Sequence, residues 1–157
     1  MPRPFVRGYS FLFGSDGLPA DGTTFDITEY NPSALWAMGN MVSTPADLRT
    51  FYRALLGERL LPPGLTALMK RTRPNQTAEW PEGVGMGLGI WSWDLPCGKR
   101  IYGHEGEAPG SNVWAFGSAD GRRTVVMQHN LLYMNWDRWE DTVLPTYFSF
   151  WCDRPAR

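Results

Sequence analysis

The sequence is poor in the residues and motifs that mark several large classes of protein. Its 157 residues include 15 basic and 16 acidic side chains, so no electrostatic feature favours binding to nucleic acid. No apolar run approaches the roughly 18 residues that a membrane-spanning helix needs. It has two cysteines and two histidines, but no Cys-x-x-Cys pair and no His-Glu-x-x-His helix. We therefore expect no nucleic-acid partner, no membrane span, no metal site and no other cofactor.

Motifs that would supply a catalytic nucleophile are also missing. The sequence has no Gly-x-Ser-x-Gly turn. Its two lysines are Lys70 and Lys99, and the residues three positions before them are Ala67 and Pro96, so no Ser-x-x-Lys occurs. A serine without an adjacent base is a weak nucleophile. The chain alone is therefore expected to be catalytically inert.

The composition is nevertheless that of a folded chain. Hydrophobic residues make up 43% and aromatic residues 14%, which fits one domain or a piece of a larger domain. The eight tryptophans could form a platform that stacks on sugar rings, but tryptophans in strands and helices more often pack in the core. Most of them lie in predicted strands or in the predicted last helix: Trp91, Trp93, Trp114, Trp136, Trp139 and Trp151.

Two helices are predicted after a turn-rich beginning. Residues 1–35 carry many Gly, Pro and Asn-Pro turn signals, and we predict mostly loop there. Thr44 as N-cap, Pro45 at the first helical position and Gly57 as the stop predict a helix between them. A shorter helix is predicted after residues 62–64. Its buried face should carry Leu65, Leu68 and Met69.

The hydrophobic period changes to two from Gly83 onward. Glycines at every second position from Gly83 to Gly89 lead into a strand, not a helix, which excludes a dinucleotide-binding loop. Strands are predicted over residues 90–93, 100–106, 113–117 and 124–128, and a helix over 136–151. The predicted fold class is α+β, an antiparallel sheet packed with helices.

The strand over residues 100–106 is the best candidate for a working site. It places His104 between glycines and ahead of the Pro109-Gly110 loop. Glycine at such a point lets a ligand or another backbone approach closely. The residues alone leave open a functional histidine or a spacer in an edge strand. The other histidine, His129, has no carboxylate neighbour in sequence and is interpreted as structural.

Several stretches, in order, resemble the C-terminal part of the serine penicillin-recognising hydrolases. This family includes class C β-lactamases, D-alanyl-D-alanine carboxypeptidases, esterases and D-aminopeptidases. Its third catalytic motif, Lys-Thr-Gly or His-x-Gly, is similar to His104-Glu105-Gly106. Three further stretches also match, namely Arg7-Gly8-Tyr9, residues 37–48 and Gly85-Met86-Gly87-Leu88-Gly89.

The resemblance implies that residues 1–157 form the C-terminal part of a single β-lactamase/transpeptidase-like catalytic domain. In this family the Ser-x-x-Lys and Tyr-x-Asn motifs lie upstream of the matched stretches. The chain would therefore lack the N-terminal part of the domain, which would be its partner. The complete protein would be a serine hydrolase that acts through an acyl-enzyme on a small-molecule or peptide amide or ester. It would be secreted or periplasmic, with a signal upstream of this chain.

The resemblance also implies roles for the residues of the motif. His104 would take the place of the motif's cation or hydrogen-bond donor, and Gly106 would leave room for the substrate backbone. The backbone N–H of Glu107 would be one of two oxyanion-hole donors. Glu105 departs from the family's Thr or Ser, whose hydroxyl helps to bind a substrate carboxylate. A carboxylate at position 105 disfavours anionic substrates, unless it points to solvent or pairs with an arginine such as Arg122 or Arg123.

The two cysteines are Cys97, in a Pro-Cys-Gly turn, and Cys152, near the end of the chain. From the residues alone, reduced thiols and a disulfide both remain open. The resemblance implies a disulfide, because the secreted carboxypeptidases link the equivalent turn and C-terminus. Two rivals to the hydrolase interpretation are a stand-alone module that binds cell-wall glycan or peptide, and a non-functional gene remnant.

Overall fold

The computed structural model describes residues 5–13, 19–75, 81–132 and 143–152. The chain divides into two units that interleave along the sequence. The first contains Met1–Val42, Glu105–Val113 and Gln128–Thr146, and the second contains Ser43–His104, Trp114–Met127 and Tyr147–Arg157. Among the described helices, none is long and apolar enough to cross a membrane.

The first unit contains a three-stranded sheet in the order β2-β1-β9. β1 (Tyr9–Phe13) pairs antiparallel with β2 (Pro19–Asp26) and parallel with β9 (Leu131–Leu132). The prediction of mostly loop over residues 1–35 is therefore wrong for these two strands. β-branched and aromatic residues favour strands, and their cross-strand pairing outweighs the neighbouring turn signals. A 3-10 helix, η1 (Pro32–Leu35), and the short helix α1 (Trp36–Gly39) follow.

The second unit begins with α2 (Pro45–Leu56), which forms as predicted. The Thr44 hydroxyl accepts a hydrogen bond from the backbone N–H of Asp47 at 3.1 Å and donates to its carboxylate at 2.8 Å. These bonds satisfy a backbone donor that the first helical turn leaves without an intrahelical partner. Gly57 ends the helix, and its N–H bonds back to the carbonyl of Arg53.

The helix α3 (Pro63–Met69) also forms, but its buried face differs from the prediction. Leu65 is 53% exposed and Leu68 is 44% exposed, whereas Thr66 is buried. The Thr66 hydroxyl donates to the carbonyls of Leu61 and Pro62, so this polar side chain is buried with partners. Of the three residues predicted to be buried, only Met69 packs against the core cluster around Leu55, Leu56 and Ile90.

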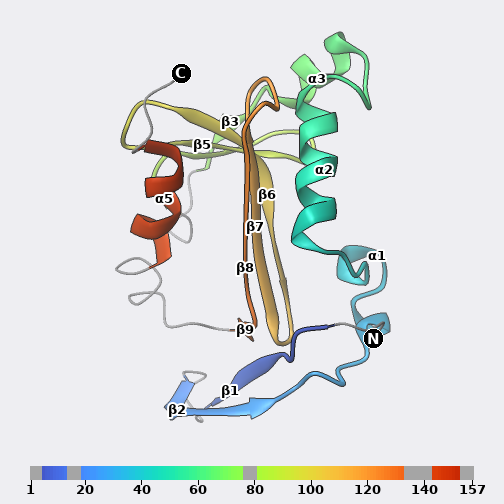
Figure 1. The fold of residues 1–157 in the computed structure, drawn as a ribbon, viewed down its shortest axis with the longest axis vertical. Helices are drawn as coiled ribbons and strands as arrows, with labels where there is room; N and C mark the ends of the chain where they lie inside the picture. Colours follow the sequence, from blue (N-terminus) through green and yellow to red (C-terminus); the bar gives the residue numbers. More distant parts are fainter. Residues whose placement is uncertain (1–4, 14–18, 76–80, 133–142, 153–157) are drawn as a thin grey trace. The chain divides into compact units, whose positions relative to one another are not determined.

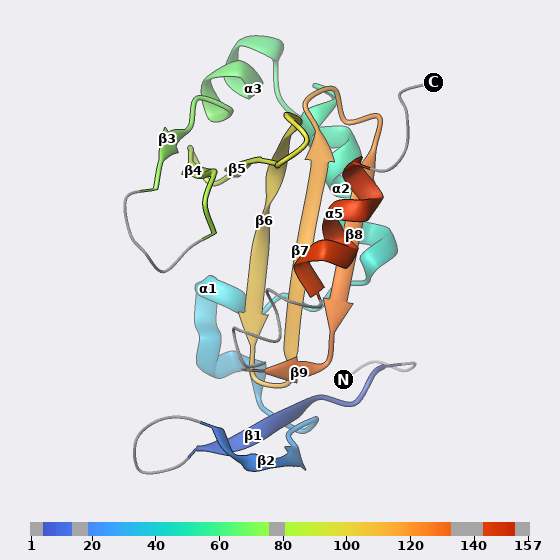
Figure 2. The ribbon, with the colours of Figure 1, turned by 90° about the vertical axis from the view of Figure 1, so that its left-hand side faces the viewer.

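A six-stranded sheet follows the helices, in the order β3-β4-β5-β6-β7-β8. Figure 2 shows that β6, β7 and β8 alternate in direction, as predicted for an antiparallel sheet. The last four strands correspond to the four predicted ones. The strands are β3 (Arg73–Pro74), β4 (Val84–Met86), β5 (Trp91–Asp94), β6 (Arg100–Ala108), β7 (Ser111–Ser118) and β8 (Thr124–His129).

Aromatic residues form the core of the second unit. The α5 helix (Leu144–Cys152) packs on one face of the sheet and α2 on the other (Figure 1). Residues 136–142 of the predicted last helix lie outside the described residues. Trp93 is 1% exposed. The centroid of its ring lies within 6.4 Å of the ring centroids of Trp114, Phe116 and Tyr147. The fold class is therefore α+β, as predicted.

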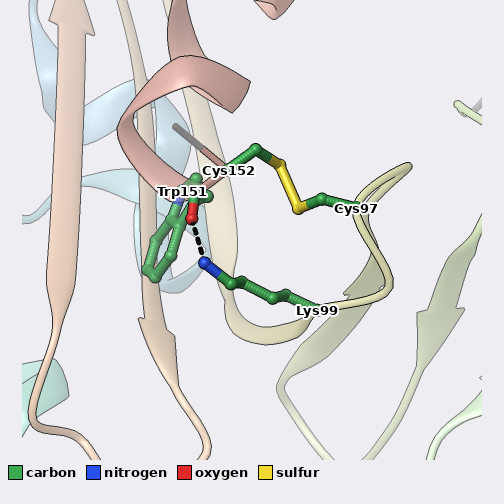
Figure 3. Close-up of a disulfide and its surroundings, with 4 residues drawn as sticks. All are labelled: Cys97, Lys99, Trp151 and Cys152. Atoms are coloured by element: carbon green, nitrogen blue, oxygen red, sulfur yellow. Dashed lines mark hydrogen bonds between the residues drawn. A yellow bond between two sulfur atoms is a disulfide. The ribbon is translucent and has the colours of Figure 1, made fainter. Parts of the chain in front are cut away.

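A disulfide joins Cys97 to Cys152, and their Cα atoms are 5.8 Å apart. It links the β5–β6 turn to the end of α5 (Figure 3). The ammonium of Lys99, two residues after Cys97, donates a hydrogen bond to the carbonyl of Trp151 at 2.6 Å. The prediction of a bond between the two cysteines is confirmed.

Candidate active-site strand

The strand β6 carries all four predicted site residues at consecutive positions, from His104 to Glu107. Its paired register with β5 runs from Asp94↔Arg100 to Trp91↔Gly103, so His104 follows the last pair. β6 passes from the second unit into the first at this point: His104 belongs to the second, and Glu105 to the first.

Gly103 fixes the backbone directly before His104. A Cβ at this position would collide with the carbonyl oxygen of Ala115 and would lie 2.6 Å from the Cα of Phe116. The backbones of β6 and β7 therefore approach too closely for any side chain other than hydrogen. The glycine before the histidine is thus required by packing, and it holds this part of β6 against its neighbour.

The His104 ring lies against an aromatic side chain of the adjacent strand. Its centroid is 4.4 Å from that of Trp91, with an angle of 38° between the ring planes. Trp91 is 6% exposed, whereas His104 is partly exposed. The imidazole is therefore supported on one side by a buried indole. This contact was not predicted from the sequence, because it depends on the pairing of β5 with β6.

Gly106 and the two acidic residues belong to the first unit. A Cβ on Gly106 would lie 3.1 Å from the Cγ1 of Val113, so little space remains there on the side toward β7. Burial and, to a smaller extent, the charge of Glu107 together raise the pKa of Glu105 from 4.5 to about 7. Burial also raises the pKa of Glu107. Residues two apart on a strand share a face, which accounts for the coupling of the two carboxyl groups.

The two arginines considered as partners for Glu105 have contacts within the second unit. The guanidinium of Arg122 lies 3.5 Å from the carboxylate of Asp120, and that of Arg123 lies over the ring of Trp151 at 5.4 Å. Partial burial is the larger cause of the raised pKa of Glu105, so this carboxyl is not simply directed into solvent.

The loop after β6 packs on the residues directly before β1. Gly110 has φ of +74°, and a Cβ there would lie 2.7 Å from both the Cα of Gly8 and the Cγ2 of Ile27. A Cβ on Gly8 would lie 2.8 Å from the Gly110 carbonyl oxygen. The loop that follows the third-motif strand and the Arg7-Gly8-Tyr9 stretch therefore meet backbone to backbone. This contact was not predicted from the sequence, where its only signal was a glycine in each segment.

A comparison with known protein families identifies the family of the chain. The sequence profile of the β-lactamase family matches residues 9–144. The chain belongs to the β-lactamase family. The resemblance inferred from the motifs is therefore confirmed.

Several solved structures are similar to this β-lactamase-family chain. It is similar to a D-stereospecific amidohydrolase from Streptomyces sp., with 37% identity over 83% of the chain and a TM-score of 0.70. It is also similar to a D-amino acid amidase from Ochrobactrum anthropi SV3, solved in complex with L-phenylalanine amide, with 28% identity over 80% and a TM-score of 0.63. A penicillin-binding protein from Bacillus halodurans, at 16% identity and a TM-score of 0.60, shares the fold.

The match covers only part of each relative. The aligned region spans 36% of the Streptomyces amidohydrolase and 35% of the Ochrobactrum amidase. The chain therefore corresponds to little more than a third of either protein.

The second histidine of this β-lactamase-family chain has a structural environment. The Nδ1 of His129 donates to the carbonyl of Leu131 at 3.1 Å, and burial lowers the pKa of its imidazole. Since Leu131 belongs to β9, this bond ties the end of β8 to the next strand. The contact supports the interpretation of His129 as structural.

The tryptophans do not form an exposed platform in the described part of the chain. Four of the six that were interpreted as core residues are buried: Trp91, Trp93, Trp114 and Trp151. Trp136 and Trp139 lie outside the described residues. Trp36 is 78% exposed. Among the residues that the structure describes, no group of His, Cys, Asp and Glu could hold a metal ion.

Proposed function

We propose that this chain supplies the third-motif strand of the acyl-transfer site in a serine amide or ester hydrolase. The observation that carries the proposal is the sequence His104-Glu105-Gly106 on β6, in a chain 37% identical to a D-stereospecific amidohydrolase. The nucleophilic serine and its lysine would come from a part of the protein outside these 157 residues, because no Ser-x-x-Lys occurs within them.

The proposed reaction has two steps. The serine hydroxyl attacks the substrate carbonyl, its proton leaves with the departing amine or alcohol, and water then hydrolyses the acyl-enzyme. The His104 imidazole would assist proton transfer around the serine. The backbone N–H of Glu107 would donate to the oxyanion, and one such donor is typically worth about 3 to 4 kcal/mol of barrier. Gly106 would leave the backbone accessible to the substrate.

The acidic pair on β6 supports a substrate that is neutral or cationic near this strand. Two carboxylates about 4 Å apart repel by about 4 kcal/mol at an effective dielectric of 20, before screening. A substrate carboxylate beside Glu105 would meet this penalty, whereas an amine would be attracted. The relative solved with L-phenylalanine amide fits a substrate of the amino acid amide class, which carries an ammonium and no free carboxylate.

The titration of Glu105 gives this preference a pH dependence. A carboxyl with a pKa of about 7 is half protonated near neutral pH, and a bound ammonium favours its charged form. Binding of a cationic substrate should therefore release a proton from the site. Its affinity should rise between about pH 6 and pH 8, provided the substrate amine stays protonated.

The complete protein is proposed to act outside the cytoplasm, secreted or in the periplasm. The Cys97–Cys152 disulfide supports this location, since structural disulfides form and persist in oxidising compartments.

A chimera tests the proposed role of the chain. The N-terminal portion of the Streptomyces amidohydrolase, which would supply the nucleophile, is joined to this chain, and release of ammonia from D-phenylalanine amide is measured. We expect turnover by the chimera, none by the chain alone, and a loss of at least tenfold in kcat for His104→Ala in the chimera. His129→Ala is the matched control and should retain activity if the protein folds. Equal turnover by the His104→Ala chimera would refute the role of His104.

A further inference from the structure

The structure points to Trp91 as the residue that positions the imidazole of His104. Its indole lies 4.4 Å from the imidazole, centroid to centroid, and Trp91 is buried in β5. We propose that Trp91 holds His104 in a single orientation, and that the strand pairing around Gly103 makes this contact possible. The consequence for catalysis rests on the function proposed above, whereas the contact itself can be tested without it.

The register brings the indole next to the histidine along the strand, because Trp91 lies directly opposite Gly103, the residue before His104. Directly opposed residues share a face of the sheet, so the missing side chain of Gly103 leaves the space beside the indole open. A larger residue at position 103 is excluded by the close approach of β7.

Trp91 is itself held in place by its strand. Ser92, the next residue, is buried, and its hydroxyl lies 2.7 Å from that of Thr72. Two residues along, Trp93 donates its indole N–H to the carbonyl of Glu82 at 3.1 Å. The side chains of Ser92 and Trp93 therefore hold β5 in place. The indole of Trp91 on this strand gives the imidazole of His104 a rigid surface to stack on.

A side chain held by packing loses rotamers that would carry the imidazole away from a reacting group. His104 is only partly buried, so the backbone alone leaves it several rotamers. The contact with Trp91 removes those in which the imidazole swings away from β5. Trp91 therefore acts through His104, and need not touch the substrate.

The test uses NMR of this chain, in which His104 and His129 are the only histidines. With labelled histidine, two ring signals appear, and a His129→Asn variant assigns them. We expect nuclear Overhauser contacts between the His104 ring and the Trp91 indole, and an upfield ring-current shift of the His104 signals. Trp91→Leu should abolish both effects, and Trp91→Phe should restore part of the shift.

Trp93→Leu is the matched control, since Trp93 is also buried in β5 but has its ring contacts with Trp114 and Phe116. It should leave the His104 shift unchanged. The proposal is overturned if Trp91→Leu leaves the His104 signals in place, or if Trp93→Leu moves them as far. If neither leucine variant folds, the proposal is decided by the nuclear Overhauser contacts between His104 and Trp91 in the wild-type chain. The absence of these contacts would overturn the proposal, and so would histidine signals at the positions of an unfolded chain. Loss of activity in the chimera would leave these NMR results unaffected, so the two proposals fail separately.

Discussion

Replacing Glu105 with glutamine should stabilise the folded chain at pH 8 and leave its stability at pH 4 nearly unchanged. The pKa of this carboxyl is about 7 in the folded chain, against 4.5 as its ordinary value. Between these values the folded state holds a proton that the unfolded state has released. Stability from this group is therefore fully present below pH 4.5 and is lost as the pH rises to 7.

The magnitude follows from the difference between the two pKa values. A difference of about 2.5 pKa units corresponds to about 3 kcal/mol, at about 1.4 kcal/mol for each unit. Solvent screening of a partly exposed carboxyl reduces this value, and we expect about 1 to 2 kcal/mol. Glutamine has no charge to desolvate, so the variant should gain this amount at pH 8.

Urea unfolding at pH 4, 5, 6, 7 and 8, followed by tryptophan fluorescence, measures the difference between wild type and Glu105→Gln. Comparing the two proteins at each pH cancels the contribution of other groups, including His129. Glu107→Gln is a useful second variant, because removing the second charge should lower the pKa of Glu105. The pH range over which Glu105 affects stability should then become narrower, but it should not disappear. A difference that is constant across the five pH values would refute the reasoning.

Three further predictions concern packing, the disulfide and substrate charge. Gly103→Ala should destabilise the chain by about 3 kcal/mol in urea unfolding, because the added methyl meets backbone. Gly64→Ala, where nothing lies within 4 Å, is its control and should change little. Cys97→Ser should lower the free energy of unfolding by about 4 kcal/mol and lower the Tm. Cys152→Ser has already lost the disulfide, so adding reductant should not lower its Tm further. In an active chimera, Glu105→Thr should raise kcat/KM for a carboxylate-bearing substrate about tenfold, if about 1.4 kcal/mol of repulsion is relieved, and equal kinetics would show that Glu105 does not act on the substrate.

Local signals in the sequence were sufficient to predict several elements of the fold. The boundaries of α2 follow from Thr44, Pro45 and Gly57, because capping chemistry acts over a few residues. The strand β6 follows from its alternating pattern, and the motif around His104 identified the family. Each of these signals depends on residues that are close in sequence.

The errors and omissions involve contacts between distant residues. Glycine and proline signals in residues 1–35 concealed the β1–β2 hairpin, whose strands are stabilised by pairing with each other. The burial of Thr66 depends on carbonyls that precede the helix, which a hydrophobic pattern does not include. The Gly8–Gly110 contact joins segments about a hundred residues apart in sequence, so neither glycine alone predicted it. The raised pKa of Glu105 likewise depends on burial that only the fold determines.

The central claim is that this chain provides one wall of a serine-hydrolase site whose nucleophile lies elsewhere. Mass spectrometry of the intact chain after incubation with a labelled penicillin tests it most directly. An unmodified mass is expected for the chain alone, because none of its serines has an adjacent lysine base. A stoichiometric adduct on any serine of these 157 residues would contradict it.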